Sequence, residues 1–253
     1  MIVTDLDGTL LRNDKTISDW TKQVLTECRG RGIKIVYATA RSHVRGFVPD
    51  ELFDGYVVKS GAAAYLGDER VYYKIMPIDD VRPLLLAAHA AGLQAVAQND
   101  DGVHYSNFDV SKKWPYLANY SMVDFATIDF DVDKIYIVTE TPESLKFVKN
   151  HVPAGLHLFI SRDDLSFVFH KDAIKSKAVA ALADRWGIDY TEIVAFGDDF
   201  VDAELLQFCG IGVAVANAID SVKVAADFVC DTNENDGVAK WLESNLLSHP
   251  KSI

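Results

Sequence analysis

Two aspartates close to the N-terminus are the first residues whose types and spacing could support chemistry. Asp5 and Asp7 follow the β-branched run Ile2–Thr4 and precede Gly8. Such a run is typical of a buried strand, and side chains at positions i and i+2 point the same way while a chain stays extended. Because two carboxylates on one side repel each other unless a cation lies between them, the pair predicts a cation site, with Mg²⁺ as the first candidate. A solvated Asp-Gly turn after an edge strand is the simpler alternative.

A second group of carboxylates follows a later apolar run. Asp198, Asp199 and Asp202 come after residues 192–196, which predict another strand. Crowded carboxylates again indicate a cation. Because ligands of open α/β sheets bind beyond the carboxyl ends of the strands, we expect this group to meet Asp5 at one edge of a sheet.

A hydroxyl and an amine are also expected near this edge. Thr39 follows the apolar segment 33–38, which predicts a strand, although Thr39 could also cap the helix after it. Lys175 and Lys177 precede a further predicted helix. A lysine in the first turn of a helix is unfavourable unless an anion balances it, because the helix dipole favours negative charge there. One of these two lysines is therefore a candidate partner for a carboxylate or a phosphate.

The elements that must position these residues fall into two patterns. Residues 1–78 and 172–253 show the alternation of strands and helices that is typical of a parallel sheet. Residues 79–171 instead contain two predicted helices and several strands arranged as hairpins, such as the one around residues 99–102. The sequence predicts an α/β protein, in which a Rossmann-like parallel-sheet core (1–78 and 172–253) carries an inserted α+β domain (79–171).

Composition and charge exclude several classes of protein. The 253-residue chain has a net charge of −12, which argues against a nucleic-acid partner because such a partner requires a basic surface. Three widely spaced cysteines predict reduced side chains in a cytoplasmic protein. No apolar run is long enough to span a bilayer, and because the first strand begins at once we expect no signal peptide. We expect a cytoplasmic protein without a membrane partner, whose acidic surface is compatible with a monomer.

Four motifs resemble those of the haloacid dehalogenase superfamily of phosphotransferases. The first is Asp5-Leu6-Asp7-Gly8-Thr9-Leu10, and the second is Thr39-Ala40-Arg41, where the family usually has Thr-Gly-Arg. The third is the lysine at the start of a predicted helix, either Lys175 or Lys177. The fourth is the segment 197–202, which is similar to the family pattern Gly-Asp-x-x-Asn-Asp. Residues 213–218 and 233–239 resemble later family segments, and the insertion between the second and third motifs resembles the cap of the Cof-type branch.

The resemblance implies a Mg²⁺-dependent phosphatase that hydrolyses phosphomonoesters of small metabolites, with sugar phosphates as the expected class. In the family, the first aspartate forms an aspartyl-phosphate and the second exchanges protons with the leaving oxygen and water. Lys177 is preferred over Lys175 because it fits the family spacing to the helix better. The implied catalytic residues are Asp5, Asp7, Thr39 and Lys177. The implied phosphate and substrate ligands are Leu6, Thr39, Ala40, Arg41 and Lys177. The implied metal site comprises Asp5, Asp7, Asp198 and Asp202, with Asp7 contributing its backbone carbonyl.

Two departures from the family pattern leave other functions open. Ala40 replaces a glycine, and Val201 stands where the fourth motif usually has an asparagine that contacts phosphate or tightens the metal shell. A phosphohexomutase on the same fold is one alternative. The other is a binding or regulatory protein with weakened catalysis, which Val201 favours but the intact motif carboxylates oppose.

Overall fold

The computed structural model describes residues 1–42, 47–115, 117, 119–160 and 164–248. These residues form two compact units. The core unit comprises residues 1–73 and those from 174 onward, and the inserted unit comprises residues 74–173. The sequence placed the two boundaries at 78/79 and 171/172. No helix in the described ranges has the length and apolar character needed to cross a bilayer.

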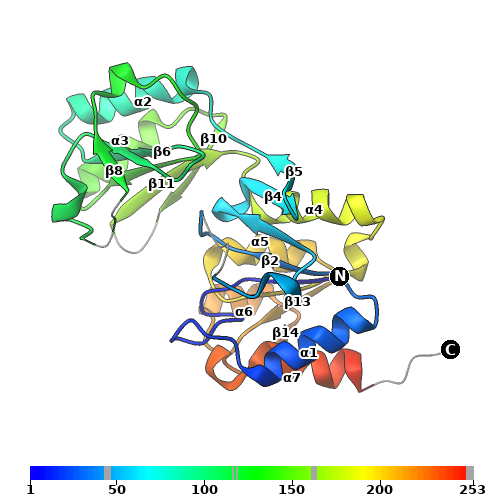
Figure 1. Cartoon of the computed structure of the whole chain (residues 1–253). Coiled ribbons are helices and arrows are strands. Elements are labelled where there is room, and N and C mark those ends of the chain that lie inside the picture. Colours follow the sequence, from blue (N-terminus) through cyan, green and yellow to red (C-terminus); the bar gives the residue numbers. More distant parts are fainter. Residues whose placement is uncertain (43–46, 116, 118, 161–163, 249–253) are drawn as a thin grey trace. The chain divides into compact units, whose positions relative to one another are not determined.

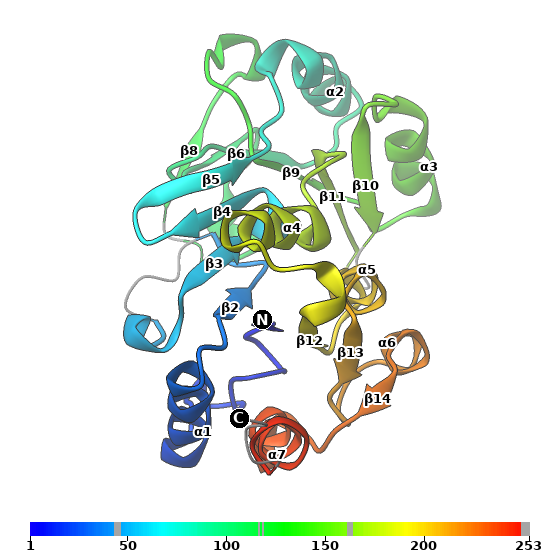
Figure 2. The same ribbon diagram turned by 90° about the vertical axis from the view of Figure 1, so that its right-hand side faces the viewer.

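The core unit is built on an eight-stranded sheet with helices on both faces (Figures 1 and 2). Its strands are β1 (Ile2–Thr4), β2 (Ile35–Ala38), β3 (Gly55–Val58), β4 (Ala63–Leu66), β5 (Glu69–Tyr73), β12 (Val194–Gly197), β13 (Ile211–Ala214) and β14 (Phe228–Val229). Its α-helices are α1 (Asp19–Gly30), α4 (Lys175–Trp186), α5 (Phe200–Phe208), α6 (Asp220–Ala225) and α7 (Gly237–Leu242).

The strand order of this sheet is β14-β13-β12-β1-β2-β3-β4-β5. The strands from β14 to β3 are parallel, and β4 and β5 form an antiparallel extension. Helices α1 and α7 contact each other on one face, and α4, α5 and α6 follow one another on the opposite face (Figure 2). The Rossmann-like α/β fold predicted from the sequence is confirmed.

The inserted unit contains a six-stranded sheet of order β10-β11-β9-β6-β7-β8. Its strands are β6 (Ala95–Gln98), β7 (His104–Ser106), β8 (Tyr120–Met122), β9 (Lys134–Val138), β10 (Leu156–Ile160) and β11 (Leu165–His170), and its α-helices are α2 (Ile78–Ala90) and α3 (Pro142–His151). All pairings are antiparallel except that of β7 with β8. The sequence did not predict β8, because a strand of three residues is too short to show a pattern.

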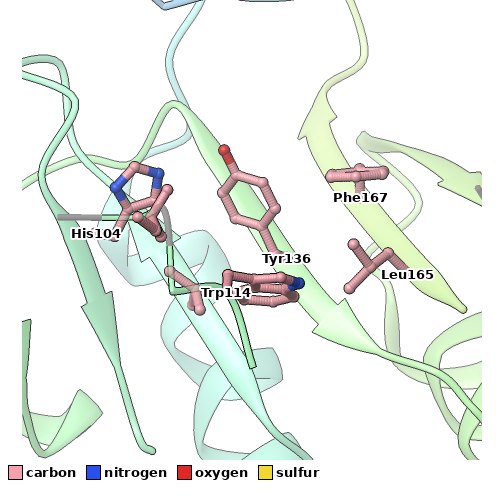
Figure 3. Close-up of a pocket in the computed structure, with 7 residues that line it drawn as sticks. His104, Trp114, Tyr136, Leu165 and Phe167 are labelled. Atoms are coloured by element: carbon pink, nitrogen blue, oxygen red, sulfur yellow. The ribbon is translucent and has the colours of Figure 1, made fainter. Parts of the chain in front are cut away.

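The two faces of this second sheet differ. Alternate residues of β6, β9 and β11 enter an apolar core together with side chains of α2 and α3. Because successive strand residues point to opposite faces, the intervening residues of these strands lie on the face away from the helices. These intervening residues include Val96, Tyr136 and Phe167, which are register partners across the three strands. These three residues line a cavity of about 260 Å³ on that face (Figure 3).

Candidate active site

Parallel register brings the ends of three central strands to one edge of the core sheet. Thr4 of β1 pairs with Phe196 of β12 on one side and with Tyr37 of β2 on the other. The residues that follow each strand, among them Asp5 and Asp198, therefore leave the sheet at the same level. This is the edge at which open α/β sheets bind ligands.

Three carboxylates gather at this edge. Carboxylate oxygens of Asp5, Asp198 and Asp202 all lie within 4.8 Å of one another. Asp5 and Asp202 are buried, and Asp198 is partly buried. Burial raises the pKa of Asp5 to about 8, reinforced by repulsion from Asp202 and Asp198, although the nearby Lys175 amine opposes this shift. Burial likewise raises the pKa of Asp198 to about 6. The cluster is electrostatically unfavourable without positive charge close by.

Lys175 supplies one positive charge to this cluster. Its Nζ donates to Asp5 Oδ1 at 2.7 Å and to Asp202 Oδ1 at 2.6 Å, and its side chain is 1% exposed. Burial opposes the charge on this amine, but the carboxylates of Asp202 and Asp5 outweigh burial and raise the pKa of Lys175 above its ordinary value. Lys175 therefore stays a cation between two aspartates.

Lys175, and not Lys177, contacts Asp5, so the predicted preference for Lys177 was wrong on this point. Helix α4 begins at Lys175, and Lys177 is exposed. The helical period contains the signal that could have separated them. Lys175 lies four and seven residues before Val179 and Leu182, which are buried, so Lys175 shares their face of the helix. Lys177 lies two residues before Val179 and is turned away from that face.

Asp202 organises the loop in front of α5. Its Oδ2 accepts hydrogen bonds from the backbone N–H groups of Asp198 at 3.2 Å and Asp199 at 3.1 Å. With Oδ1 occupied by Lys175, both oxygens have protein partners, so Asp202 supports the cluster from behind. Asp199 caps α5 by accepting a hydrogen bond from the N–H of Phe200. Val201 is half-buried in the first turn of the same helix.

Asp7 has a different environment from Asp5. Arg41 donates to both of its oxygens, Nε to Oδ2 at 2.6 Å and Nη2 to Oδ1 at 2.8 Å. Lys15 adds a second cation, with Nζ 2.8 Å from Oδ1. The hydrogen bonds from Arg41, followed by those from Lys15, outweigh burial and lower the pKa of Asp7 to about 2. The side chain of Asp7 is therefore held as a carboxylate, apart from the three clustered carboxylates.

The remaining predicted ligands differ in what they can offer. Thr39 is 1% exposed, and its Oγ1 accepts a hydrogen bond from the N–H of Arg41 at 3.2 Å. The side chain of Leu6 is fully buried in the apolar core, so only its backbone could bind a ligand. Ala40 is exposed, and its backbone lies between the Thr39 hydroxyl and Arg41.

Four residues with direct structural roles at this edge were missed as site residues. Thr9 Oγ1 donates to Asp198 Oδ1 at 2.6 Å, and Lys15 contacts Asp7 as described above. Asn217 Nδ2 donates to the Gly8 carbonyl at 2.7 Å, and Asn233 Nδ2 donates to the Leu11 carbonyl at 2.9 Å. Both asparagines lie in the segments 213–218 and 233–239 that resemble family segments, and the structure shows that they fix the loop after β1.

Known proteins are similar to this chain over nearly its whole length. A sequence model of the haloacid dehalogenase-like hydrolases matches residues 2–242. A Haemophilus influenzae protein whose assignment as a phosphatase is provisional is 32% identical over 263 residues, with 97% of each chain covered. The 5-amino-6-(5-phospho-D-ribitylamino)uracil phosphatase YitU of Bacillus subtilis is 29% identical over 264 residues, with 96% of each chain covered. The structure of the subclass IIB sugar phosphatase BT4131 is 25% identical with a TM-score of 0.81, and the match covers 96% of this chain and 97% of that one.

Proposed function

Because the chain belongs to the haloacid dehalogenase-like hydrolases and is a phosphoric monoester hydrolase, we propose that it works with Mg²⁺ through an aspartyl-phosphate on Asp5. The observation that carries this proposal is the buried cluster of Asp5, Asp198 and Asp202 around Lys175. A carboxylate can act as a nucleophile toward phosphorus. Here that carboxylate lies among groups that can bind cations and anions, at the ligand-binding edge of the sheet.

The donor set fits Mg²⁺. Mg²⁺ prefers oxygen ligands and is usually held by one or two carboxylates, water and substrate phosphate. Asp5 and Asp198 would hold the ion directly. Asp202 would support them from behind, and the backbone carbonyl of Asp7 is the further donor that the resemblance to the family implies. When bound, the ion supplies positive charge that offsets the negative charge of the phosphoryl oxygens.

Asp5 is proposed to start the reaction. One of its carboxylate oxygens attacks phosphorus, an Asp5–phosphoryl bond forms, and the bond between phosphorus and the ester oxygen breaks. Lys175 holds Asp5 in position at 2.7 Å and places a fixed positive charge beside the phosphoryl oxygens. Thr39 contributes its hydroxyl. Catalysis in such a site is mostly positioning and electrostatic stabilisation.

Asp7 is proposed to move the protons. The departing alkoxide needs a proton, and the water that later cleaves the aspartyl-phosphate must lose one. In the structure Arg41 and Lys15 keep Asp7 ionised, and an ionised carboxylate is suited to accept the proton that the water must lose. An incoming phosphate dianion is an alternative partner for the Arg41 guanidinium. We propose that substrate binding weakens the hydrogen bonds from Arg41 to Asp7. Asp7 can then take up the proton that it donates to the departing alkoxide.

The substrates are small phosphorylated metabolites, and sugar phosphates are the class that the sequence predicts. A sugar phosphatase and a ribitylaminouracil-phosphate phosphatase are both among the similar proteins. The alcohol part of the substrate is thus the variable feature among these similar proteins. A panel of phosphorylated sugars and ring-bearing alcohols is the direct way to assign it.

Metal dependence tests the proposal. Purified protein is expected to release phosphate from p-nitrophenyl phosphate with Mg²⁺ present, and EDTA should lower the rate at least about 100-fold, because the metal offsets phosphoryl charge. Excess Mg²⁺ should restore the rate. Circular dichroism before and after EDTA checks that the fold is unchanged. Undiminished release in EDTA would overturn the metal-dependent mechanism.

Gly8→Ala is expected to lower kcat/KM at least about tenfold. Gly8 has φ +83°, and an added Cβ would lie 2.5 Å from Asp198 Oδ2, so the loop or the carboxylate must shift. Displacing a catalytic group by about 1 Å can cost about 100-fold in rate. Gly67→Ala is the matched control, because Gly67 also has positive φ but an added Cβ meets nothing within 4 Å. Equal kcat/KM in the two variants would contradict the tight packing of Gly8 against Asp198.

A further inference from the structure

The turn between β3 and β4 has an unusual backbone conformation. Its three residues Lys59, Ser60 and Gly61, which we call the β3–β4 turn, have φ angles of +56°, +57° and +102°. Residues with a Cβ are disfavoured in this left-handed region. In the described ranges five non-glycine residues have positive φ, and Lys59 and Ser60 are the only adjacent pair among them. Such a conformation persists only where surrounding contacts hold it in place.

A hairpin connection alone can require left-handed residues. The connection between β4 and β5 in the same sheet shows how little else such a turn needs. Its Gly67 has φ +58°, and a Cβ added there would meet nothing within 4 Å. The β3–β4 turn instead contacts two further segments of the core unit, so the need to join two strands does not account for its packing.

The first of these segments is the loop after β2. The N–H of Lys59 donates to the Arg41 carbonyl at 2.8 Å, and the N–H of Ser60 donates to the Thr39 carbonyl at 3.1 Å. Because the direction of a backbone N–H depends on the φ and ψ angles beside it, these two hydrogen bonds require the left-handed conformation. The turn thereby fixes the backbone of the loop that carries the Thr39 hydroxyl and the Arg41 guanidinium.

The second segment is the start of α4. An added Cβ at Gly61 would lie 2.2 Å from the carbonyl carbon of Ile174 and 2.4 Å from the nitrogen of Lys175, whereas real Cβ contacts are essentially never shorter than 3.0 Å. Both are backbone atoms, which cannot rotate aside like the end of a flexible side chain. Glycine therefore allows the turn to contact the peptide bond at which α4 begins. This contact fixes the backbone from which the Lys175 side chain reaches Asp5.

We propose that the β3–β4 turn is a positioning element, which sets the loop of Thr39 and Arg41 at the correct distance from Lys175 for one phosphoryl group to contact all three. The turn acts through backbone contacts, so Gly61 and Ser60 are positioning residues and not catalytic ones. The inference rests on the roles proposed above for Thr39, Arg41 and Lys175, and it adds what holds them together. Phosphoryl transfer depends mainly on positioning, and a misplacement of about 1 Å can cost about 100-fold in rate.

Gly61→Ala is expected to lower kcat for p-nitrophenyl phosphate about 100-fold, because the added Cβ separates the turn from α4. Gly67→Ala is the matched control, since Gly67 is also a hairpin glycine with positive φ but has room for a Cβ. Its kcat should stay within about twofold of wild type, as is usual for surface substitutions. Equal kcat in the two variants would overturn the inference.

Inorganic phosphate distinguishes positioning from a loss of stability. As a competitive inhibitor it reports on folded molecules alone, because unfolded chains do not bind it. Its inhibition constant should rise at least about tenfold in Gly61→Ala, the effect of losing one hydrogen bond to a charged group, and should stay unchanged in Gly67→Ala. Urea unfolding with Mg²⁺ present measures stability. A lower urea midpoint with an unchanged inhibition constant would mean that Gly61 is merely structural and would overturn the inference.

Ser60 gives a test that does not depend on the folding of Gly61→Ala. Ser60→Val places a β-branched residue at φ +57°, a conformation that such residues avoid, so the turn should open and kcat should fall at least about tenfold. Ser60→Gly adopts the same φ without strain and should retain kcat within about threefold. Equal losses in the two variants would mean that the hydroxyl matters and not the backbone, and would overturn the inference.

These measurements separate the inference from the proposed function. If Asp5→Asn stays active, the covalent mechanism fails, but the phosphate inhibition constants of Gly61→Ala and Gly67→Ala still decide whether the turn positions the site. If Asp5→Asn is inactive and both glycine variants match wild type, the proposed function stands and the inference is wrong.

Discussion

Asp5→Asn is expected to abolish phosphate release, lowering kcat more than about 1000-fold, the scale on which removal of a covalent nucleophile acts. The amide has nearly the shape of the carboxylate, but it has no negative charge and cannot form the aspartyl-phosphate. It also removes one of the two carboxylates that Lys175 contacts. Phosphate release from p-nitrophenyl phosphate in Mg²⁺ measures the effect.

A matched carboxylate controls for the loss of charge. Asp199→Asn changes an exposed aspartate that caps α5 and has no contact with Lys175 among the hydrogen bonds and ion pairs described, and asparagine is also a good capping residue. Its kcat should stay within about threefold of wild type. Acid-quenched wild-type protein should also carry one phosphoryl group by mass spectrometry, and Asp5→Asn should carry none. Activity that survives in Asp5→Asn would refute the covalent mechanism.

The arrangement of the core could be predicted because its local signals agree. The three strands that end at the site are short apolar runs, and each is followed directly by a polar residue, as at Ile2–Thr4 before Asp5 and at Val194–Gly197 before Asp198. Parallel register then requires these polar residues to meet at one edge. No knowledge of side-chain contacts is needed for that step, so the meeting of Asp5 with Asp198 follows from strand ends alone, whereas Asp202 joins them from the first turn of α5.

The contacts that depend on side-chain direction could not be predicted in the same way. Lys15 lies ten residues after Asp5 in a loop, has φ +68°, and reaches Asp7 only because that loop folds back. Asn217 and Asn233 donate hydrogen bonds to backbone carbonyls, and no sequence pattern identifies which carbonyls accept them.

The two lysines at the start of α4 give the second large expected effect. Lys175→Met should lower kcat at least about 100-fold, because the variant lacks the charge that holds Asp5 in position. It should also lower the free energy of unfolding by about 3–5 kcal/mol, the cost of leaving buried charges unpaired.

Lys177→Met is the matched control. It removes the same charge from an exposed position two residues further along the chain, so kcat and the free energy of unfolding should stay close to wild type. Phosphate release in Mg²⁺ and urea unfolding in EDTA measure the two variants. The unfolding is done in EDTA because bound metal could replace part of the lost charge. Methionine keeps the length of the lysine stem, so a loss confined to position 175 reports the charge between Asp5 and Asp202 rather than packing or the net charge of the protein. Equal losses at both positions would mean that the helix start, and not this ion pair, governs activity.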